Sequence, residues 1–173
     1  MERGDAVREA YELYSARLVA QAYALTGDYA EAQDVVHEAF ARALSRPARF
    51  AAVAEVEAWL RTVVLNVFRS RYRRRMVFDK LVRLGRVDRA PADLPGISTD
   101  RLVLVDALQR LPRGTREAVV LHHLADLPVT EVAELLQVSV SAVKTRLVRG
   151  RAALAQLLDD RPTTTERNEV RHA

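Results

Sequence analysis

Apolar residues recur at helical spacing along most of this chain, and that periodicity constrains the fold more than any other feature. The clearest example follows Asp28 and Glu31, which are three residues apart in the pattern of a capping box at a helix start. One face of the following helix is apolar and the opposite face is charged. The apolar positions are Ala32, Val35, Val36, Ala39, Phe40, Ala43 and Leu44. A helix with this face must bury it against other helices.

The same spacing predicts two further helices in the first half of the chain. One begins at the N-cap Asp5 and ends at Gly27, and the other begins at Val56. Pro47 closes the intervening helix, because proline lacks the amide hydrogen that an interior turn requires. The helix from Val56 is apolar at first and then enters a cationic segment, residues 69–75. Its two halves are therefore expected to have different functions.

Periodicity fails between residues 85 and 100, where glycine, proline and serine accumulate. The sequence thus predicts an all-α protein of two small helical domains, residues 5–84 and 101–160, joined by a flexible linker over residues 85–100. Residues 161–173 are polar and are expected to form a disordered tail, with no added sensing domain.

The second domain is predicted to contain a helix-turn-helix. An initial helix ends at Pro112, and Thr115 is expected to cap a second one. Two more helices follow, over residues 128–136 and 139–158, and only two residues separate them. That close spacing is typical of the helix-turn-helix motif.

The longer helix of this pair is predicted to present one face to DNA. Val143 and Leu147, with Leu154, must pack against the shorter helix, which fixes the direction of the opposite face. Arg146 and Arg151 flank that face at angles suited to phosphates. The side chains on it are of the kind that read base edges in a major groove: Lys144, Thr145, Val148 and Arg149. A solvated basic surface is the alternative, and the surrounding helices favour DNA binding.

The cationic segment in the first domain is a second candidate nucleic-acid surface. It contains five arginines, and Tyr72 among them supplies aromatic carbon for stacking on unpaired bases. Such a charge density repels itself unless phosphates or carboxylates neutralise it. Asn66, one turn earlier in an apolar run, is either a hydrogen-bonded buried amide or a base-reading residue.

The sequence offers no catalytic or metal-binding arrangement. It has no cysteine, which excludes disulfides, thiolate metal sites and thiol nucleophiles. The adjacent His122 and His123 point about 100° apart on a helix, which does not suit a shared metal ion. Asp34 and Glu38 are one turn apart, and solvent or a protein partner is their expected contact. We therefore expect no enzymatic activity, no metal and no cofactor.

Charge and hydropathy indicate where the protein acts. The net charge is +4, and the clustering of arginines suits a polyanionic partner. No segment reaches the roughly 18 apolar residues of a membrane span, and the N-terminus lacks the apolar core of a signal peptide. A cytoplasmic location without a membrane partner is expected.

Several motifs follow one another along the chain. They are Asp34-Val-Val-His-Glu-Ala-Phe40, Ala58-Trp-Leu-Arg61 with Asn66 and the arginines after it, Leu111-Pro112, Arg116-Glu117, and Val143-Lys-Thr-Arg-Leu147. Together they resemble the extracytoplasmic-function (ECF) sigma factors, group 4 of the sigma-70 family. The resemblance implies a region 2 domain followed by a region 4 helix-turn-helix domain, in a protein that directs RNA polymerase to promoters and assists promoter melting.

The resemblance also implies protein partners. The first domain would dock on the beta-prime clamp of the polymerase core, and the second domain on the beta flap. An anti-sigma factor is a further expected partner. The docking residues implied for the first domain are Asp34, Val35, Glu38 and Phe40.

Promoter DNA would be contacted in two places. Residues 45–55 would form the specificity loop, beside a pocket for a flipped-out minus-ten base. The residues implied for the minus-ten element are Asn66, Arg69, Ser70, Arg71, Arg73 and Arg74. Those implied for the minus-thirty-five element are Ser139, Lys144, Thr145, Arg146, Val148, Arg149 and Arg151.

Three positions depart from the family pattern. His37 stands where the family usually has glutamine, and Pro128 stands at the usual capping serine. Gln137 replaces the customary glycine of the turn between the paired helices. If that residue is left-handed, its side chain costs about 1 kcal/mol.

A stand-alone helix-turn-helix regulator is the alternative function. Such a protein would bind duplex DNA tightly by itself, and the motifs of the first domain would have no purpose in it. An enzyme acting on nucleic acid is a more distant alternative, because it would need metal-binding carboxylates or a nucleophile beside the arginines.

Overall fold

The computed structural model describes residues 4–82 and 97–160, and these residues form helices joined by short connections, with no strand. The chain divides into two compact units, Met1–Ile97 (unit 1) and Ser98–Ala173 (unit 2). Most of the predicted linker and all of the predicted tail lie outside the described residues. The last two linker positions, Thr99 and Asp100, instead belong to the first turn of a helix.

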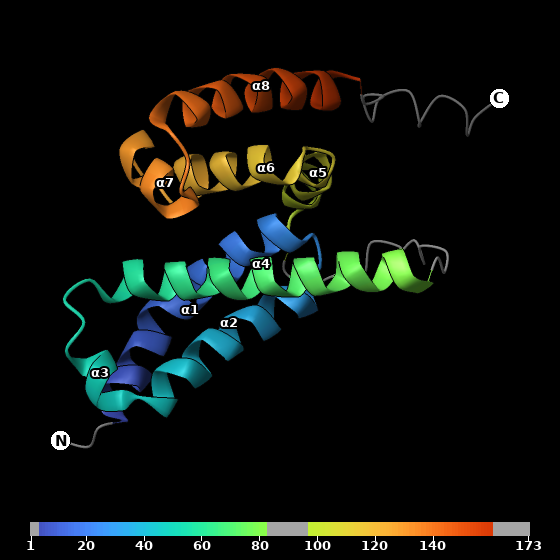
Figure 1. Ribbon diagram of the computed structural model, residues 1–173. Helices are drawn as coiled ribbons and strands as arrows, with labels where there is room; N and C mark the ends of the chain where they lie inside the picture. Colours follow the sequence, from blue (N-terminus) through green and yellow to red (C-terminus); the bar gives the residue numbers. More distant parts are fainter. Residues whose placement is uncertain (1–3, 83–96, 161–173) are drawn as a thin grey trace. The chain divides into compact units, whose positions relative to one another are not determined.

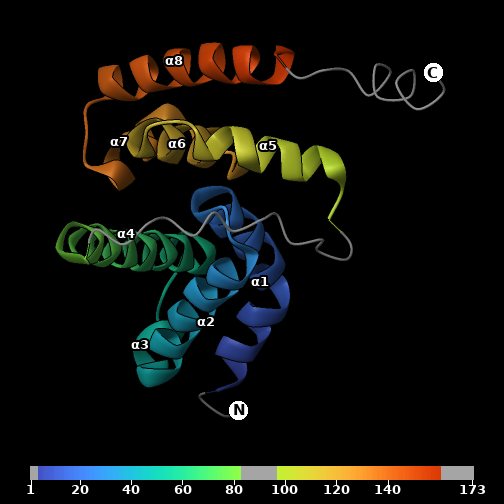
Figure 2. The same cartoon turned by 90° about the vertical axis from the view of Figure 1, so that its right-hand side faces the viewer.

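Unit 1 contains α1 (Asp5–Thr26), α2 (Tyr29–Ser45), α3 (Pro47–Ala51) and α4 (Val56–Val82). The helices α1 and α2 lie side by side and antiparallel, and α4 packs across both (Figures 1 and 2). The cationic segment is the second half of α4, which continues without a break from the apolar half, as predicted.

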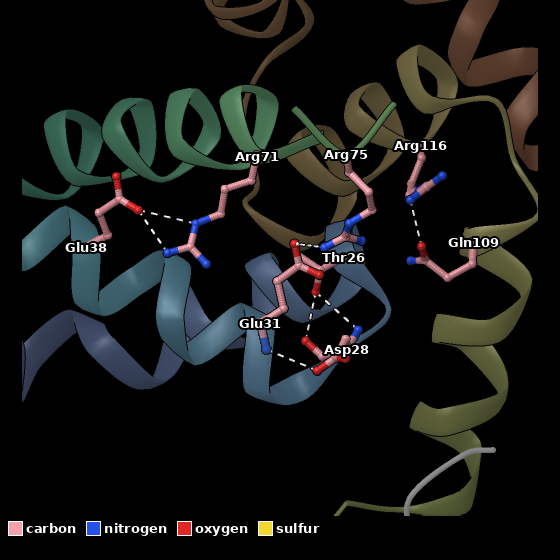
Figure 3. A network of polar contacts seen from close by, with 8 residues as sticks. All are labelled: Thr26, Asp28, Glu31, Glu38, Arg71, Arg75, Gln109 and Arg116. Atoms are coloured by element: carbon pink, nitrogen blue, oxygen red, sulfur yellow. Dashed lines mark hydrogen bonds and ion pairs between the residues drawn. The ribbon is translucent and has the colours of Figure 1, made fainter. Parts of the chain in front are cut away.

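The turn between α1 and α2 is held by backbone and side-chain hydrogen bonds. Gly27 adopts a left-handed conformation (φ 72°) and its N–H donates to the Tyr23 carbonyl at 2.8 Å. The Asp28 carboxylate accepts from the Glu31 N–H at 3.0 Å, which confirms the predicted cap (Figure 3). The cap predicted for α1 is wrong by one residue, because Gly4 occupies it and Asp5 lies in the first turn.

The core of unit 1 contains the apolar face of α2 with one exception. Leu44 is 56% exposed, although the spacing assigned it to that face. At 100° per residue Leu44 lies about 120° around the helix from Ala32, at the edge of the face. The other six positions are at most 4% exposed: Ala32, Val35, Val36, Ala39, Phe40 and Ala43.

The segment expected to be a loop after α2 contains the short helix α3. Pro47 is its first residue, so the proline that closes α2 also begins α3. Phe50 is buried and packs edge-on against Trp59 at the start of α4, with ring centroids 5.4 Å apart. This contact joins α3 to the start of α4, while α3 packs mainly on α1 and α2.

Unit 2 contains α5 (Thr99–Gln109), α6 (Arg113–Val119), a π-helical turn η1 (Val120–Leu124), α7 (Val129–Leu136) and α8 (Val140–Asp159). The helix α8 packs against α5, α6 and α7 (Figure 2). Thr115 lies inside α6 and does not cap it, contrary to the prediction. Pro112 precedes the first turn, and its carbonyl accepts from the Arg116 N–H at 2.9 Å.

The helix-turn-helix consists of α7 and α8. Gln137 ends α7 in a left-handed conformation (φ 56°, ψ 47°), which is the strained geometry expected for the missing glycine. Its neighbour Val138 donates its N–H to the Ala133 carbonyl at 3.0 Å. Ser139 then caps α8 by accepting from the Ala142 N–H at 3.1 Å.

Candidate nucleic-acid interface

The arginines of α4 fall into two groups that face different partners. Arg71 donates to the Glu38 carboxylate at 2.9 and 3.2 Å, and Arg75 lies 2.6 Å from Glu31 (Figure 3). Both acids belong to α2, so these two arginines connect α4 to α2. Arg74 is exposed and lines a hollow with Arg71 and Arg75 beside Glu31 and Glu38, whereas Arg73 is exposed on the opposite side of α4. Carboxylates therefore neutralise part of the charge, and Arg73 and Arg74 remain exposed.

Glu38 is the central acid of this contact. It also pairs with Arg42, whose Nη2 lies 2.6 Å from its Oε1. The hydrogen bond from Arg71 is the largest cause and lowers the pKa of Glu38; burial opposes it, and the hydrogen bond and charge of Arg42 lower the pKa further, so that the net shift is downward. Glu38 is thus an anion at neutral pH that positions two cations.

Asn66 is exposed, so the alternative that it is a buried amide is wrong. It borders a cleft of about 420 Å³ between the end of α2, α3 and the first half of α4. The residues that line the cleft combine cations, aromatic rings and small polar groups: Arg42, Ser45, Arg46, Arg49, Phe50, Trp59, Val63 and Asn66. Such a surface can stack an unpaired base and hold the phosphates beside it.

The family resemblance implied a pocket at this position, and sequence reasoning missed most of the residues that line the cleft. The specificity loop was expected beside Trp59, and Asn66 was already a candidate. Arg46 and Arg49 were not singled out, because they lie in a segment without periodicity. The one signal in the sequence is that these two arginines lie three residues apart, directly after the helix that Pro47 closes.

The helix α2 exposes two of the four residues expected to dock on a partner, since Asp34 is exposed and Glu38 is half-buried. Val35 is fully buried and Phe40 is 4% exposed, so neither can contact another protein in this fold. Asp34 is exposed, and His37 and Leu44 are exposed as well. The motif residues Val35 and Phe40 instead belong to the core, and their burial directs Asp34, His37 and Leu44 toward solvent.

Tyr11 of α1 extends this exposed surface of α2. Its ring stacks on His37 at 6.3 Å between centroids and packs edge-on against Phe40 at 5.0 Å. Its hydroxyl lies 3.4 Å from His37 Nε2. Asp34, His37, Leu44 and Tyr11 therefore form a mixed polar and apolar surface, the α2 face.

The outward face predicted for α8 is present in unit 2. Val143 is fully buried and Leu147 is 5% exposed, as the packing argument requires. Val148 is 59% exposed. The remaining exposed side chains on this helix include Lys144, Thr145, Arg149 and Arg151.

Two residues predicted for the α8 face have other contacts. Arg146 is half-buried, and its guanidinium packs on Gly114, where a Cβ would lie 3.1 Å from Cζ. Ser139 uses its hydroxyl oxygen to cap the helix. Both residues help to hold α8 in place.

Other polar residues of unit 2 were not predicted to have a structural role. His122 Nδ1 donates to the Leu127 carbonyl at 2.8 Å and so fixes the turn before α7. Partial desolvation lowers the pKa of His123, and the neighbouring His122 and Arg151 lower it further. The buried Arg116 donates to Gln109 Oε1 at 2.6 Å, which connects α6 to α5 (Figure 3).

No helix in residues 4–82 and 97–160 is long and apolar enough to cross a membrane. In the same ranges no group of three or more histidine and acidic side chains is placed to hold a metal ion.

Known proteins match both units in the order found here. Residues 10–77 match the family described as Sigma-70 region 2, and residues 101–154 match Sigma-70, region 4. The ECF RNA polymerase sigma factor SigW of Bacillus subtilis is 30% identical over 90% of this chain and 90% of its own length. BldN of Streptomyces coelicolor is 32% identical over 90% of this chain, which spans 61% of that longer protein.

Solved structures agree with these matches. The sigma factor RpoE of Bartonella quintana, solved in complex with the anti-sigma factor NepR, has a TM-score of 0.75 and 26% identity, covering 91% of this chain and 99% of that one. CnrH, solved with the cytosolic domain of CnrY, shares the fold with a TM-score of 0.62, 24% identity and coverage of 90% and 89%. Two helical units with these sequences identify the chain as a member of the ECF RNA polymerase sigma factors, with sigma-70 regions 2 and 4.

Proposed function

We propose that this protein binds the polymerase core, directs it to promoters with two recognition elements, and assists strand opening at the first of them. One observation carries the proposal: each unit has its own outward cationic surface, and the two surfaces suit different forms of DNA. The cleft of unit 1 suits unpaired bases, whereas the α8 face of unit 2 suits a duplex major groove. A stand-alone duplex-binding regulator would use only the second.

Within unit 1, the minus-ten contacts divide by exposure. Asn66, Arg73 and Arg74 are assigned direct contacts to the unpaired strand, because their side chains are exposed on α4. Arg71 is assigned a positioning role, since it is paired with Glu38. The remaining residues of this proposed site are Arg69 and Ser70.

Within unit 2, the minus-thirty-five contacts are assigned to the exposed face of α8. Lys144, Thr145 and Arg149 offer hydrogen-bond donors to base edges, and Val148 offers methyl groups to thymine. Arg151 contacts phosphate. Arg146 and Ser139 support this face through their contacts with Gly114 and with the α8 backbone.

The α2 face is assigned to docking on the beta-prime clamp of the polymerase. Asp34 and Leu44 supply an exposed charge and an exposed apolar group, the mixture found at protein interfaces. Unit 2 would contact the beta flap. Because RpoE of Bartonella quintana was solved with an anti-sigma factor, we also propose that an anti-sigma protein controls this chain in the cytoplasm.

A reconstitution experiment tests the proposal. Polymerase core is mixed with this protein and run-off transcription is measured on a library of promoter fragments. Asp34→Arg combined with Leu44→Asp should abolish core binding, because it reverses a charge and places a second charge at an apolar contact. Glu9→Arg, an exposed acid on α1, is the matched control and should bind normally. Promoter-specific transcription that survives in the double variant would rule out docking through the α2 face.

A further inference from the structure

Two carboxylates of α2 hold two arginines of α4 in unit 1. Arg71 donates from Nε and Nη2 to one oxygen of Glu38, at 3.2 and 2.9 Å, and Arg75 Nη2 lies 2.6 Å from Glu31 Oε1 (Figure 3). The arginines are four residues apart, so both point from the same side of α4 toward α2. Part of the cationic segment therefore already has anionic partners within the chain.

The two pairs line a hollow in which acids outnumber arginines. Its volume is about 550 Å³. The charged residues that line it are the acids Asp28, Glu31, Asp34 and Glu38 and the arginines Arg71, Arg74 and Arg75. A phosphate that approaches this side of α4 meets carboxylates beside every guanidinium group. It would gain little Coulomb energy, because attraction and repulsion largely cancel.

The opposite side of α4 has a different character. Asn66 and Arg73 are seven residues apart, which is two helical turns, so they lie on one side of the helix. At 100° per residue, Arg73 points about 160° away from Arg71. Asn66 and Arg73 are both exposed. A nucleic acid can therefore reach Arg73 without approaching the acids of α2.

A carboxylate and a phosphate compete for the same donors of an arginine. Each accepts parallel N–H groups from the planar guanidinium, so an arginine held by one is not available to the other. The side chains of Arg71 and Arg75 are 29% and 57% exposed. Neither is buried, and removal of the carboxylates would leave both within reach of a phosphate.

We propose that Glu31 and Glu38 act as internal phosphate mimics, which occupy Arg75 and Arg71 and restrict nucleic-acid binding by unit 1 to the opposite side of α4. The contact is autoinhibitory, because it lowers the affinity of the free protein for nucleic acid in general. This inference rests on the proposed nucleic-acid surface of unit 1. It gives the acids of α2 a function separate from docking on the polymerase.

Binding of the full-length protein to a labelled single-stranded oligonucleotide, measured by fluorescence anisotropy, tests the inference. Glu31→Gln with Glu38→Gln should tighten binding about tenfold in about 0.1 M salt. The slope of log K against log salt should steepen by about 1.4, because each of two freed arginines adds a phosphate contact of about 0.7. Glu9→Gln with Glu12→Gln removes two exposed acids of α1 and is the control matched for net charge. An equal gain in the control would attribute the effect to net charge and overturn the proposal.

Two single variants test the same inference without changing an acid. Arg73→Gln and Arg71→Gln each remove one charge from α4. Arg73→Gln should weaken binding about fivefold in about 0.1 M salt, whereas Arg71→Gln should leave it nearly unchanged, because Glu38 already occupies Arg71. In the Glu31→Gln and Glu38→Gln background, Arg71→Gln with Arg75→Gln should remove most of the gain. Equal weakening by the two single variants would mean that phosphates already reach Arg71, and the masking would be wrong.

Transcription by the reconstituted holoenzyme separates this inference from the proposed function. Circular dichroism first confirms that each variant is folded. Promoter-specific transcription by the wild type, together with no gain in oligonucleotide binding by the Glu31→Gln and Glu38→Gln variant, would overturn the masking alone. Absence of both transcription and oligonucleotide binding in every variant would contradict the proposed function and the masking together.

Discussion

Gly150 lies where α8 packs tightly against α6. It is buried in α8, and a Cβ placed on it would lie 2.6 Å from Val119 Cγ2 and 3.1 Å from Thr115 Cγ2. In an open helix, alanine is favoured over glycine by about 1 kcal/mol. Here the steric conflict outweighs that gain, because α6 and α8 would have to separate.

Gly150→Ala should therefore lower the free energy of unfolding of unit 2, by about 1–3 kcal/mol. Urea unfolding followed by circular dichroism measures this. Gly114→Ala is the matched control: its Cβ would meet only the flexible end of Arg146, at 3.1 Å. Gly114→Ala should leave the free energy of unfolding nearly unchanged. A Gly150→Ala variant with a higher free energy of unfolding than the wild type would show that the α6–α8 contact is loose.

Glu38 provides a second test at the level of one side chain. Its pKa is lowered in the folded protein, chiefly by the hydrogen bond from Arg71, relative to an ordinary value of 4.5. The folded state therefore binds a proton less readily than the unfolded state. The stabilisation is complete above pH 4.5 and is lost as the pH falls through the lower folded-state pKa.

Glu38→Gln should lower the free energy of unfolding at neutral pH by about 1 kcal/mol, the upper range for partly exposed ion pairs. The difference between wild type and variant should shrink as the pH drops below 4.5. Unfolding titrations at several pH values measure it. Glu12→Gln, an exposed acid on α1, is the control and should show no such trend. A difference that stays constant down to the acid transition would mean that Arg71 and Glu38 are not coupled.

At the scale of elements, long periodic segments were predictable and short ones were not. The spacing predicted α2 and α4, because their apolar faces extend over several turns. It missed α3, which has five residues and shows no period of its own. The segment Val120–Leu124 was expected to be helical, but its π-helical form (η1) was not predicted. Gly150 was missed for a related reason, since helical periodicity indicates which face is buried but not how closely two helices approach.

The candidate-site residues were likewise predictable where the periodicity of one helix fixes their direction, and not elsewhere. The outward direction of Lys144 and Arg149 followed from the buried positions of Val143 and Leu147 in one helix. Val35 and Phe40 were assigned to docking through a motif, and the structure buries both. A motif does not distinguish core residues from contact residues when the two alternate on one helix. The cleft combines the end of α2, α3 and α4, and no local pattern brings those segments together.

The turn of the helix-turn-helix gives an element-scale prediction. Gln137 is left-handed, and glycine adopts that conformation without the steric conflict that a Cβ causes. Gln137→Gly should raise the free energy of unfolding of unit 2 by about 0.5–1 kcal/mol. In contrast, Gln156→Gly within α8 should lower it by about 1 kcal/mol. Thermal unfolding measures both, and a destabilised Gln137→Gly variant would mean that this side chain has contacts outweighing the strain.

At the scale of the whole molecule, the two proposed DNA surfaces belong to separate units and would make separate contributions to promoter use. Each unit is small and can neutralise few phosphates, so the protein alone should bind promoter DNA weakly. The polymerase core would bring the two surfaces to a common promoter. One transcription assay can then distinguish base contacts made by unit 2 from phosphate contacts made by the arginines of unit 1.

Lys144→Ala with Arg149→Ala should reduce transcription to an extent that depends on the minus-thirty-five sequence, because a lost base contact costs roughly 1–3 kcal/mol at the position it reads. Arg73→Ala with Arg74→Ala should reduce transcription on all promoters alike, since phosphate contacts do not vary with sequence. Run-off transcription on promoters with altered minus-thirty-five elements separates the two patterns. Val143→Asp is a folding control, because a carboxylate in that fully buried position should unfold unit 2 and remove its helical signal. If the Lys144 and Arg149 variants lower output equally on every minus-thirty-five sequence, these side chains contact only phosphates, and the base-reading surface of unit 2 lies elsewhere.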